Sequence, residues 1–407
     1  MRPGSITDLF GLGTLAPPTR RSLHLVFSSS LLMMMGVNLV QPVLPAMIDP
    51  LGITEAEVGL VIAVYTAPAI LLAPMLGFAA DRYGRRSLLA VGLIVFGLAG
   101  AAIFFAPSFQ WVLILRAIQG LGFATVTPLV IVLIGDLLEG HREVAGQGLK
   151  VFIDRIGYVI LPPLGGGLAT IAWYWPFLTN IVGVPLGILV LLWMPETRPS
   201  QTVQPWSYMK DMLRVAQRPH LVIAFSAGFL RFFLDYGFLT YLPLFVVRMR
   251  GLSTTEAGLL MIPYALGAMI TSSQAGRMAA GYEKTRLLLM AFVVTGVSLV
   301  AVPLAWNIPL ISGALVFYGL ANGIISPMQK SLLTQNAPIE LRGGVVSLDR
   351  LSQQIAKTSA VSVVGLLLTV TEITTLFWLL GIIALASVGL MAALVQRTPP
   401  TSAAQTP

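Results

Sequence analysis

The sequence contains no cysteine and only three histidines in 407 residues. The absence of thiols excludes disulfides, thiolate metal sites and thiol nucleophiles. Charged residues are also scarce, at 10% of the chain, compared with about 25% in soluble domains. Hydrophobic residues reach 56%, and the mean hydropathy is +0.85. So few charges cannot cover the surface of a soluble protein of this size, so the composition excludes a soluble enzyme, a disordered chain and a fibrous repeat protein.

The chain instead contains long apolar runs. These indicate a helical membrane protein, because a spanning helix needs about 20 mainly apolar residues. We predict twelve spans, at residues 23–47, 55–79, 87–107, 109–136, 148–171, 175–194, 220–247, 257–280, 286–304, 308–334, 345–370 and 373–396. A tail over 1–22 precedes them, a polar loop over 195–219 divides them, and a tail over 397–407 follows them.

The distribution of positive charge predicts the orientation. With the N-terminus on the cytoplasmic side, 21 of the 25 lysines and arginines fall in tails, loops and helix ends of that side. Cytoplasmic loops carry such an excess, so we expect both termini in the cytoplasm and the chain in the cell (inner) membrane. The same asymmetry explains the pI near 9.9, because basic side chains face the anionic headgroups of the lipid bilayer. We therefore expect no nucleic-acid partner.

The chain divides into two six-span halves, over 23–194 and 220–396, which show an internal repeat. Gly120-Leu121-Gly122 with Pro128 matches Gly319-Leu320-Ala321 with Pro327 at an offset of 199 residues. Ile153-Asp154-Arg155-Ile156 matches Leu348-Asp349-Arg350-Leu351 at an offset of 195. Duplicated halves favour a carrier that rocks about a central site.

The loop between the second and third spans carries a sequence motif. Its defining positions are Gly77, Asp81, Arg82, Gly84, Arg85 and Arg86. Glycine permits close helix approach, and an acid at a helix terminus can pair with a neighbouring arginine. The stretch resembles the signature loop of the major facilitator superfamily, G-x-x-x-D-R-x-G-R-R. The resemblance implies that Asp81 helps to latch the outward-open state; a generic positively charged loop is the alternative.

The fourth span contains Arg116, Gln119, Gly120 and Gly122. An arginine inside a span is costly and usually functional. The segment resembles the R-x-x-Q-G-x-G motif of the same family, which is associated with proton-driven carriers. A fixed positive charge can also tune a nearby carboxyl group or bind an anion. The alternative is a structural salt link or an arginine that snorkels to the membrane surface.

The fifth span contains Gly157, Pro162, Gly165 and Gly166. It resembles the antiporter motif of drug-exporting members, G-x-x-x-G-P-x-x-G-G, with Leu161 in place of the second glycine. Glycine and proline allow a kink and tight packing between spans five and eight. Ordinary packing of small residues is the alternative.

The seventh span carries Arg231 and Asp235, four residues apart on one helix face. Each would be costly alone near the middle of the membrane, so we expect them to pair and to face a cavity. Such a carboxyl can take up and release protons, so Asp235, with Arg231 and Arg116, is our leading candidate for proton coupling. A permanent structural bridge is the alternative.

Two further sets complete the candidates. Asp154, Arg155, Asp349 and Arg350 lie at matching positions of spans five and eleven, and we predict an inner gate closed by salt links in the outward-facing state; interface anchoring is the alternative. Polar or aromatic side chains predicted to line a substrate cavity, rather than to face lipid or the core, are Asn38, Gln41, Tyr65, Gln119, Tyr236, Tyr241, Asn322 and Gln329.

The resemblance implies a twelve-helix major facilitator fold with two pseudo-symmetric bundles, similar to the drug:proton antiporter group. It implies secondary active transport without a cofactor, most simply proton-coupled export of drugs or other amphipathic small molecules. A proton-coupled permease for sugars or organic anions is the alternative. A membrane-embedded enzyme or sensor fits less well, because no catalytic cluster, phosphate-binding glycine loop or extramembrane domain is evident. We expect a monomer.

Overall fold

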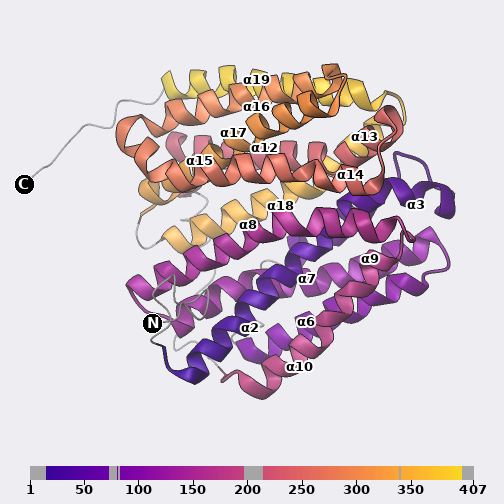
Figure 1. Ribbon diagram of the computed structural model, residues 1–407. Coiled ribbons are helices and arrows are strands. Elements are labelled where there is room, and N and C mark those ends of the chain that lie inside the picture. The colour runs from indigo at the N-terminus through magenta and orange to yellow at the C-terminus, as the bar shows by residue number, and fades with distance from the viewer. Residues whose placement is uncertain (1–14, 73–79, 81–82, 197–213, 339–340, 397–407) are drawn as a thin grey trace, which may run out of the picture.

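Helices account for all regular secondary structure among the described residues (Figure 1). The computed structural model describes residues 15–72, 80, 83–196, 214–338 and 341–396. Helices suit an apolar chain in lipid, because each helix pairs its backbone N–H and C=O groups within itself. They run side by side in two groups, the first half of the chain below and the second half above in Figure 1.

The elements of the first half are α2 (Pro17–Met34), η1 (Met35–Leu39), η2 (Gln41–Val43), α3 (Leu44–Leu51), α4 (Leu60–Thr66), α6 (Arg85–Ala102), η3 (Ile103–Phe105), α7 (Phe109–Leu137), α8 (His141–Ala169), α9 (Trp175–Leu178), η4 (Thr179–Val182) and α10 (Gly183–Trp193). Those of the second half are α12 (Pro219–Leu239), α13 (Leu242–Arg250), α14 (Thr254–Leu259), α15 (Met261–Gly281), α16 (Lys284–Leu304), α17 (Ile308–Asn336), α18 (Arg342–Leu367) and α19 (Ile373–Gln396).

Nine helical segments of the described chain are long and apolar enough to cross a membrane. The predicted spans 55–79, 257–280 and 345–370 are not among the nine. In the first of these, the apolar helix Leu60–Leu72 meets the undescribed residues 73–79. The other two correspond to α15 and α18, which lie among the long helices in Figure 1. α15 contains a run of serine, threonine and glutamine, and α18 carries four charges, and these polar residues keep both helices out of the nine apolar segments.

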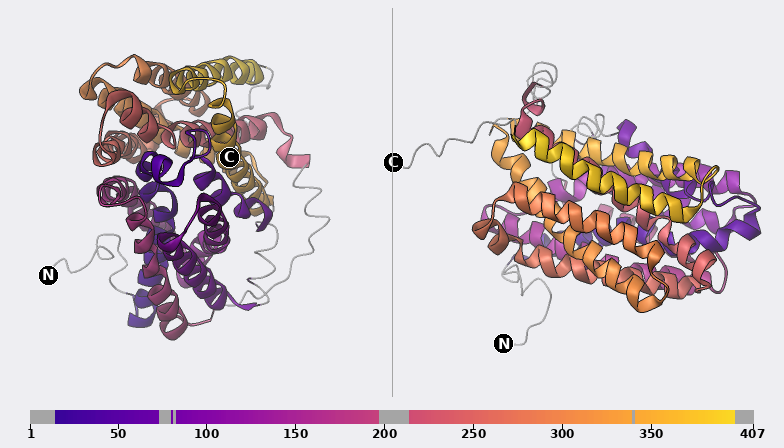
Figure 2. Two further views of the ribbon diagram at one scale, coloured as in Figure 1. Left: turned by 90° about the vertical axis from the view of Figure 1, so that its right-hand side faces the viewer. Right: turned by 90° about the horizontal axis from the view of Figure 1, so that it is seen from above.

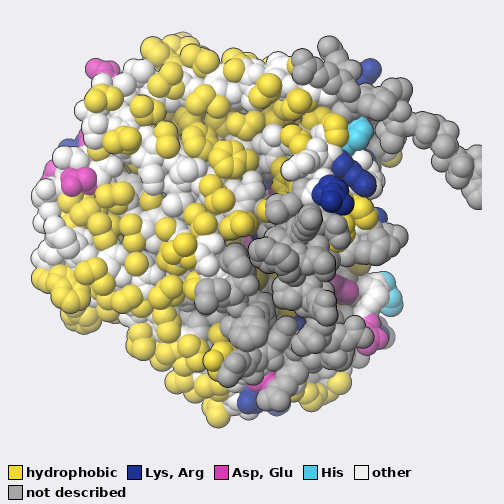
Figure 3. Space-filling model, turned by 180° about the vertical axis from the view of Figure 1, so that it is seen from behind, with side chains coloured by type: hydrophobic (Ala, Val, Ile, Leu, Met, Phe, Trp, Pro, Cys, Tyr) yellow, Lys and Arg dark blue, Asp and Glu magenta, His cyan; other side chains and the backbone are white. Residues whose placement is uncertain are grey.

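The surface is consistent with a membrane environment. Figure 3 shows hydrophobic side chains across the middle of one face, with charged side chains gathered toward the two ends of the helices. Exposed large side chains such as Trp111, Leu192, Phe317 and Leu366 contribute to the apolar surface. An extended apolar surface of this kind indicates contact with lipid.

The helix ends define two poles of the molecule. We call the pole where α2 begins and α19 ends the terminal end, and the opposite pole, where α3, α9 and α13 lie, the far end (Figures 1 and 2). The first span changes geometry along its length: α2 passes into the π-helical η1 and the 3-10 turn η2, where Pro42 removes a backbone donor. The seventh span is likewise divided, between α12 and α13.

The two halves are joined at the far end. One hydrophobic core belongs to the first half alone, whereas a larger core combines far-end residues of the first half with residues along the length of the second half. Polar contacts between the described residues of the two halves are Gln41–Thr240, Asp49–Arg248, Glu55–Arg248, Thr66–Thr358 and Gly166–Thr254. These contacts lie at the far end or midway along the helices, so the structure is closed at the far end.

Glycines allow α8 and α14 to approach closely across this interface. A Cβ atom on Gly166 would lie 2.2 Å from the carbonyl oxygen of Thr254, and one on Gly258 would lie 2.4 Å from that of Pro162. Thr254 Oγ1 also donates a hydrogen bond to the Gly166 carbonyl at 2.9 Å. Small residues permit such backbone contacts between membrane helices, so this seam depends on glycine.

Candidate functional site

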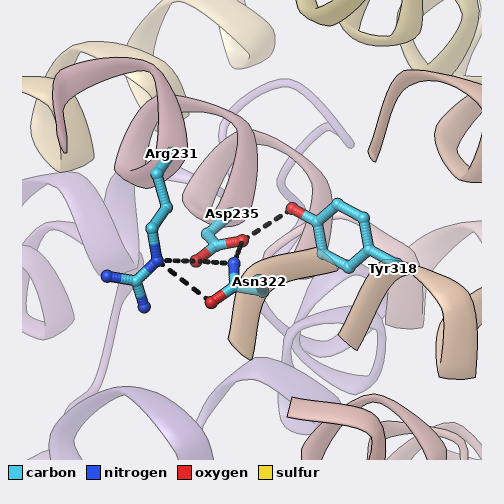
Figure 4. A network of polar contacts seen from close by, with 4 residues as sticks. All are labelled: Arg231, Asp235, Tyr318 and Asn322. Atoms are coloured by element: carbon cyan, nitrogen blue, oxygen red, sulfur yellow. Dashed lines mark hydrogen bonds and ion pairs between the residues drawn. The ribbon is translucent and has the colours of Figure 1, made fainter. Parts of the chain in front are cut away.

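A buried carboxylate lies near the middle of the seventh span, the first span of the second half. Asp235 is 6% exposed and stands at the middle of the helical span Pro219–Arg250. Tyr318 Oη donates a hydrogen bond to Asp235 Oδ1 at 2.7 Å. Asn322 Nδ2 donates to Oδ1 at 2.6 Å and to Oδ2 at 2.8 Å (Figure 4). Both donors come from one face of α17, so neutral groups of a neighbouring helix satisfy the charge of Asp235.

Arg231 joins this network through Asn322. Its Nε atom donates to Asn322 Oδ1 at 3.0 Å, whereas Nε and Asp235 Oδ2 are 3.8 Å apart. The two charges therefore lie on one helix face, as their spacing predicts, but Asn322 connects them more closely than they contact each other (Figure 4). The side chains of Arg231 and Asp235 are 12% and 8% exposed.

A second cation, Lys357 of α18, lies beside Arg231. Lys357 Nζ is 4.7 Å from the centroid of the Phe232 ring and 5.4 Å from that of Tyr236. Arg231 Cζ is 4.6 Å from the Phe232 centroid. Phe232 therefore contacts both cations through cation–π interactions. Neither Lys357 nor Phe232 is among the site residues predicted from the sequence.

Arg116 lies apart from this network, in a buried site of the first half. It is completely buried and donates to the carbonyls of Val61 at 2.8 Å and Gly36 at 2.7 Å. It also donates to Gln119 Oε1 at 2.8 Å and stacks on Tyr65, with Cζ 4.2 Å from the ring centroid. These contacts tie α7 to α4 and η1. Among the described residues Arg116 contacts neither Arg231 nor Asp235, so its predicted part in proton coupling stays a prediction.

The polar atoms around Arg116 are not all satisfied. Tyr65 Oη, Gln119 Nε2 and Asn180 Oδ1 are buried and have no hydrogen-bond partner among the described residues. Gly36 and Gly100 make room for two of these side chains, because a Cβ atom would lie 2.1 Å from Tyr65 Oη and 2.4 Å from Gln119 Nε2, respectively. The packing around this group is therefore tight.

The internal repeat relates these two sites. An offset of 199 residues places Gln119 opposite Tyr318, Tyr65 opposite Tyr264, and Gly36, whose carbonyl binds Arg116, opposite Asp235. Corresponding regions of the two halves thus hold a buried cation, Arg116, and a buried carboxylate, Asp235, although the offset does not pair these two residues with each other. Sequence reasoning missed Tyr318, but this offset from Gln119 could have found it.

The predicted inner-gate residues contact partners within their own halves. Asp154 binds Lys150 at 2.5 Å and accepts a hydrogen bond from Ser30 at 2.7 Å. Asp349 accepts from Gln329 at 3.0 Å and from Gln353 at 2.6 Å. Arg155 and Arg350 form no ion pair with a described residue. The predicted salt links across the halves are not formed in this state, which is closed at the far end instead.

The loop motif is only partly described, because Gly77, Asp81 and Arg82 lie outside the described residues. Gly84 has a positive φ of 85° and starts α6. Arg85 pairs with Asp136 of α7, and Arg86 Nε lies 3.6 Å from Glu196 Oε2. These described motif residues therefore tie together the terminal ends of three helices within one half.

The glycines of the fifth-span motif lie at helix contacts. Gly166 faces Thr254 across the interface, and Pro162 faces Gly258. A Cβ atom on Gly165 would lie 1.9 Å from the Leu39 carbonyl oxygen, and one on Gly157 would lie 3.2 Å from Leu31. The segment thus packs α8 against the first span and against α14.

The predicted cavity residues are mostly buried in helix packing rather than open to a cavity. Fractional exposures are 5% for Asn38, 4% for Gln41, 0% for Tyr65, Gln119 and Tyr241, and 2% for Asn322 and Gln329. Tyr241 Oη donates to the Val361 carbonyl at 2.9 Å, and Gln329 binds Asp349. These side chains are buried in contacts between helices, which is why they do not line an open cavity as predicted. Tyr236 alone of the set is partly exposed.

Comparisons with known proteins agree with this architecture. The family profile described as Major Facilitator Superfamily matches residues 26–358 and 225–407. The chain belongs to the major facilitator superfamily. The bacillibactin exporter of Bacillus subtilis (strain 168) is 30% identical over 338 residues, which cover 79% of this chain and 83% of that protein.

Other major facilitator proteins are more distant. The quinolone resistance protein NorA of Staphylococcus aureus is 26% identical over 183 residues, 45% of this chain and 47% of that protein. A bacterial homolog of the human lysosomal transporter Spinster, solved in an inward-facing and occupied conformation, superposes with a TM-score of 0.76 at 16% identity. That match covers 95% of this chain and 100% of the other. The predicted all-α major facilitator fold with two six-helix bundles is confirmed, and the chain is an integral membrane transporter.

Proposed function

We propose that this major facilitator exports amphipathic small molecules in exchange for protons, by alternating access between two bundles. The observation that carries the proposal is the Asp235 network. A carboxylate is held at the middle of a span by Tyr318 and Asn322, with Arg231 at 3.8 Å. Intramembrane carboxylates of this kind mark proton pathways in transporters. The similarity to the bacillibactin exporter and to the quinolone resistance protein NorA supports export.

The network suggests how protonation couples to movement. With Asp235 charged, Asn322 donates to the carboxylate and accepts from Arg231, so all three side chains hold one arrangement. A proton on Asp235 removes the charge that this arrangement compensates, which weakens the contact with α17 and releases Arg231. Substrate that arrives at the same site competes with that proton, and the proton gradient supplies the energy.

The orientation follows from the positive-inside rule. We propose that the terminal end faces the cytoplasm, because it carries most lysines and arginines, and that the protein resides in the inner membrane as a monomer. The far end then faces outward and is closed in this structure. Substrate would load from the cytoplasm in this state, as export requires.

The test is proton flux in proteoliposomes with a pH-sensitive dye inside. Adding a transported compound to acid-loaded vesicles should release protons, and Asp235→Asn should abolish that release. Glu283→Gln removes an exposed carboxylate, 57% exposed, that pairs with Arg286 within one turn, and serves as the matched control. Full proton-driven transport by the Asp235→Asn protein would refute the proposal.

A proton-coupled permease for metabolites is the second candidate. Arg231 and Lys357 outnumber the single carboxylate at the middle of the second half, which favours neutral or anionic substrates over cationic drugs. In the same assay, a response only to a small sugar or organic acid would select this candidate. The direction of the proton movement would then distinguish symport from antiport.

A further inference from the structure

Two cations at the middle of the second half have no carboxylate hydrogen-bonded to them. Arg231 uses Nε for Asn322, and its two terminal nitrogens make no hydrogen bond to a described residue. Lys357 donates to the neutral Gln354 at 2.6 Å and forms no ion pair within the described part of the chain. Both groups contact the same Phe232 ring. Two like charges around one ring repel each other, so this arrangement favours an added anion.

The carboxylates nearby are already engaged. Asp235 accepts from Tyr318 and Asn322. Asp154, across the interface on α8, is held by Lys150 of its own helix at 2.5 Å. Asp349 accepts from two glutamines. Of the three, only Asp235 forms an ion pair with one of the two cations, Arg231 at 3.8 Å, so the two cations exceed the carboxylates paired with them by one in this state.

Further cations strengthen the positive field. Lys330 and Arg350 of the second half and Lys150 of the first half are all close enough to Lys357 or Arg231 for their charges to interact. Lys330 is exposed and Arg350 is partly exposed. These five cations outnumber the carboxylates Asp154, Asp235 and Asp349 in this part of the bundle, and a net positive charge attracts and concentrates ligands of the opposite sign.

Aromatic side chains lie beside the two cations, Arg231 and Lys357. Phe232, Tyr236 and Lys357 are all partly exposed, and Phe229 stacks on Phe233 with centroids 6.1 Å apart. Aromatic rings favour stacking with other rings, and a planar guanidinium stacks on aromatic faces. The local chemistry therefore combines positive charge with an aromatic surface.

We propose that Arg231 and Lys357 bind the acidic group of an aromatic organic anion, whose ring packs on Phe232 and Tyr236. This inference rests on the proposed transport role of the site and names its substrate class. The anion neutralises two neighbouring cations, and its ring takes the place of water against two aromatic side chains. A cationic amphipath meets repulsion from the same two groups.

The first test uses wild-type protein in lipid nanodiscs and three probes that share one ring system. Naphthalene-2-carboxylate, naphthalene-2-carboxamide and 2-naphthylmethylammonium differ in charge but hardly in shape. Equilibrium dialysis, corrected with empty nanodiscs, should show the carboxylate bound about tenfold more tightly than the amide, and the ammonium most weakly. Equal binding of the three, or tightest binding of the ammonium, would overturn the proposal.

Variants then locate the site. Lys357→Gln and Arg231→Gln should each weaken carboxylate binding about tenfold and leave carboxamide binding within twofold, whereas Lys357→Arg should retain most of the affinity. Arg286→Gln removes an exposed arginine and serves as the control, with no change expected. If Lys357→Gln does not fold, carboxylate binding by the Lys357→Arg protein and the charge preference of the wild-type protein still test the proposal. Unchanged carboxylate binding in both glutamine variants would place the anion elsewhere and refute the assignment.

Binding is measured without a proton gradient, so the two proposals fail separately. Anion binding that depends on Lys357, in a protein that moves no protons, would support the substrate class and refute proton coupling. Proton exchange driven by the ammonium probe and lost in Asp235→Asn would support proton coupling and refute the anionic substrate class.

Discussion

Asp49 and Arg248 occupy equivalent positions of the two halves, 199 residues apart, and form an ion pair of 3.0 Å with each other. Gln41 and Thr240 have the same separation and are 3.4 Å apart. Residues that contact their own equivalents lie beside the axis that relates two copies. The pseudo-twofold axis of this transporter therefore passes between the first and seventh spans, and these contacts close the far end along it.

Removal of Arg248 should loosen the far end. Arg248→Gln removes the ion pairs with Asp49 and Glu55, and exposed pairs contribute up to about 1 kcal/mol. We expect the far end to open about two- to fivefold more often. The chain has no native cysteine, so a Thr240→Cys reporter can measure opening through its rate of modification by a membrane-impermeant maleimide.

The matched control is Arg250→Gln, because Arg250 donates to the carbonyls of Pro303 and Ala305 within its own half. That protein should react at the rate of the reporter alone. Equal rates in Arg248→Gln and Arg250→Gln would show that the Asp49 pair does not hold the far end.

Gly166 should be indispensable to the closed far end, and Gly167 should not. A Cβ atom on Gly166 would lie 2.2 Å from the backbone oxygen of Thr254, whereas one on Gly167 meets nothing within 4 Å. Gly166→Ala should therefore separate α8 from α14, speed maleimide modification of the Thr240→Cys reporter and reduce transport at least tenfold. Gly167→Ala, one residue away in the same motif, should behave as wild type. Equal transport by the two proteins would mean that this seam is not essential.

The sequence predicts the helices better than it predicts the contacts. Predicted spans such as 109–136 and 308–334 agree closely with α7 and α17, because a membrane imposes a minimum length on apolar runs. Arg231 and Asp235 share a helix face because helical spacing fixes this. The donors from α17 depend instead on how two helices cross, and a tyrosine or an asparagine within a span does not by itself reveal its partner. Spacing likewise cannot tell which end is closed, so the inner-gate pairs, expected in the outward-facing state, stay a prediction that this structure does not test.

We expect Tyr318 to contribute to bundle stability and proton exchange through its hydroxyl group. Tyr318→Phe removes the 2.7 Å hydrogen bond to Asp235 and leaves the donor Asn322 in place. We expect a loss of about 1 kcal/mol in the stability of the folded bundle, because one bond to a buried charge is lost while the acceptor keeps a partner. A lower Tm in nanodiscs, with proton exchange reduced several-fold, would be the result.

Tyr264→Phe provides the comparison for this change. The Tyr264 ring lies 5.4 Å from that of Tyr318, but its hydroxyl makes no hydrogen bond with a described residue. This variant should keep the wild-type Tm and exchange rate. Similar losses in both variants would mean that ring packing, rather than the bond to Asp235, explains the effect.

Two helix N-terminal caps at equivalent positions of the two halves should make closure of the far end sensitive to strong acid. Ser253 begins α14 with a capping box, in which Glu256 Oε2 accepts from the Ser253 amide and hydroxyl, each at 2.8 Å. Glu57 makes the same contacts with Thr54, 199 residues earlier in the chain. Backbone hydrogen bonds from Ser253 and Thr54, followed by those from their hydroxyls, lower the pKa of each glutamate below its usual value of 4.5.

A lowered pKa means that each cap stabilises the folded far end above the unfolded-state pKa and is lost as the pH falls through the folded-state value. The closed fraction should therefore be constant from pH 7 to about pH 5 and should fall below about pH 4. Spin-label distances across the far end would measure it. The double variant Glu57→Gln/Glu256→Gln carries neutral caps, so its closed fraction should be lower at pH 6 and independent of pH. The same acid response in both proteins would assign the sensitivity to other groups.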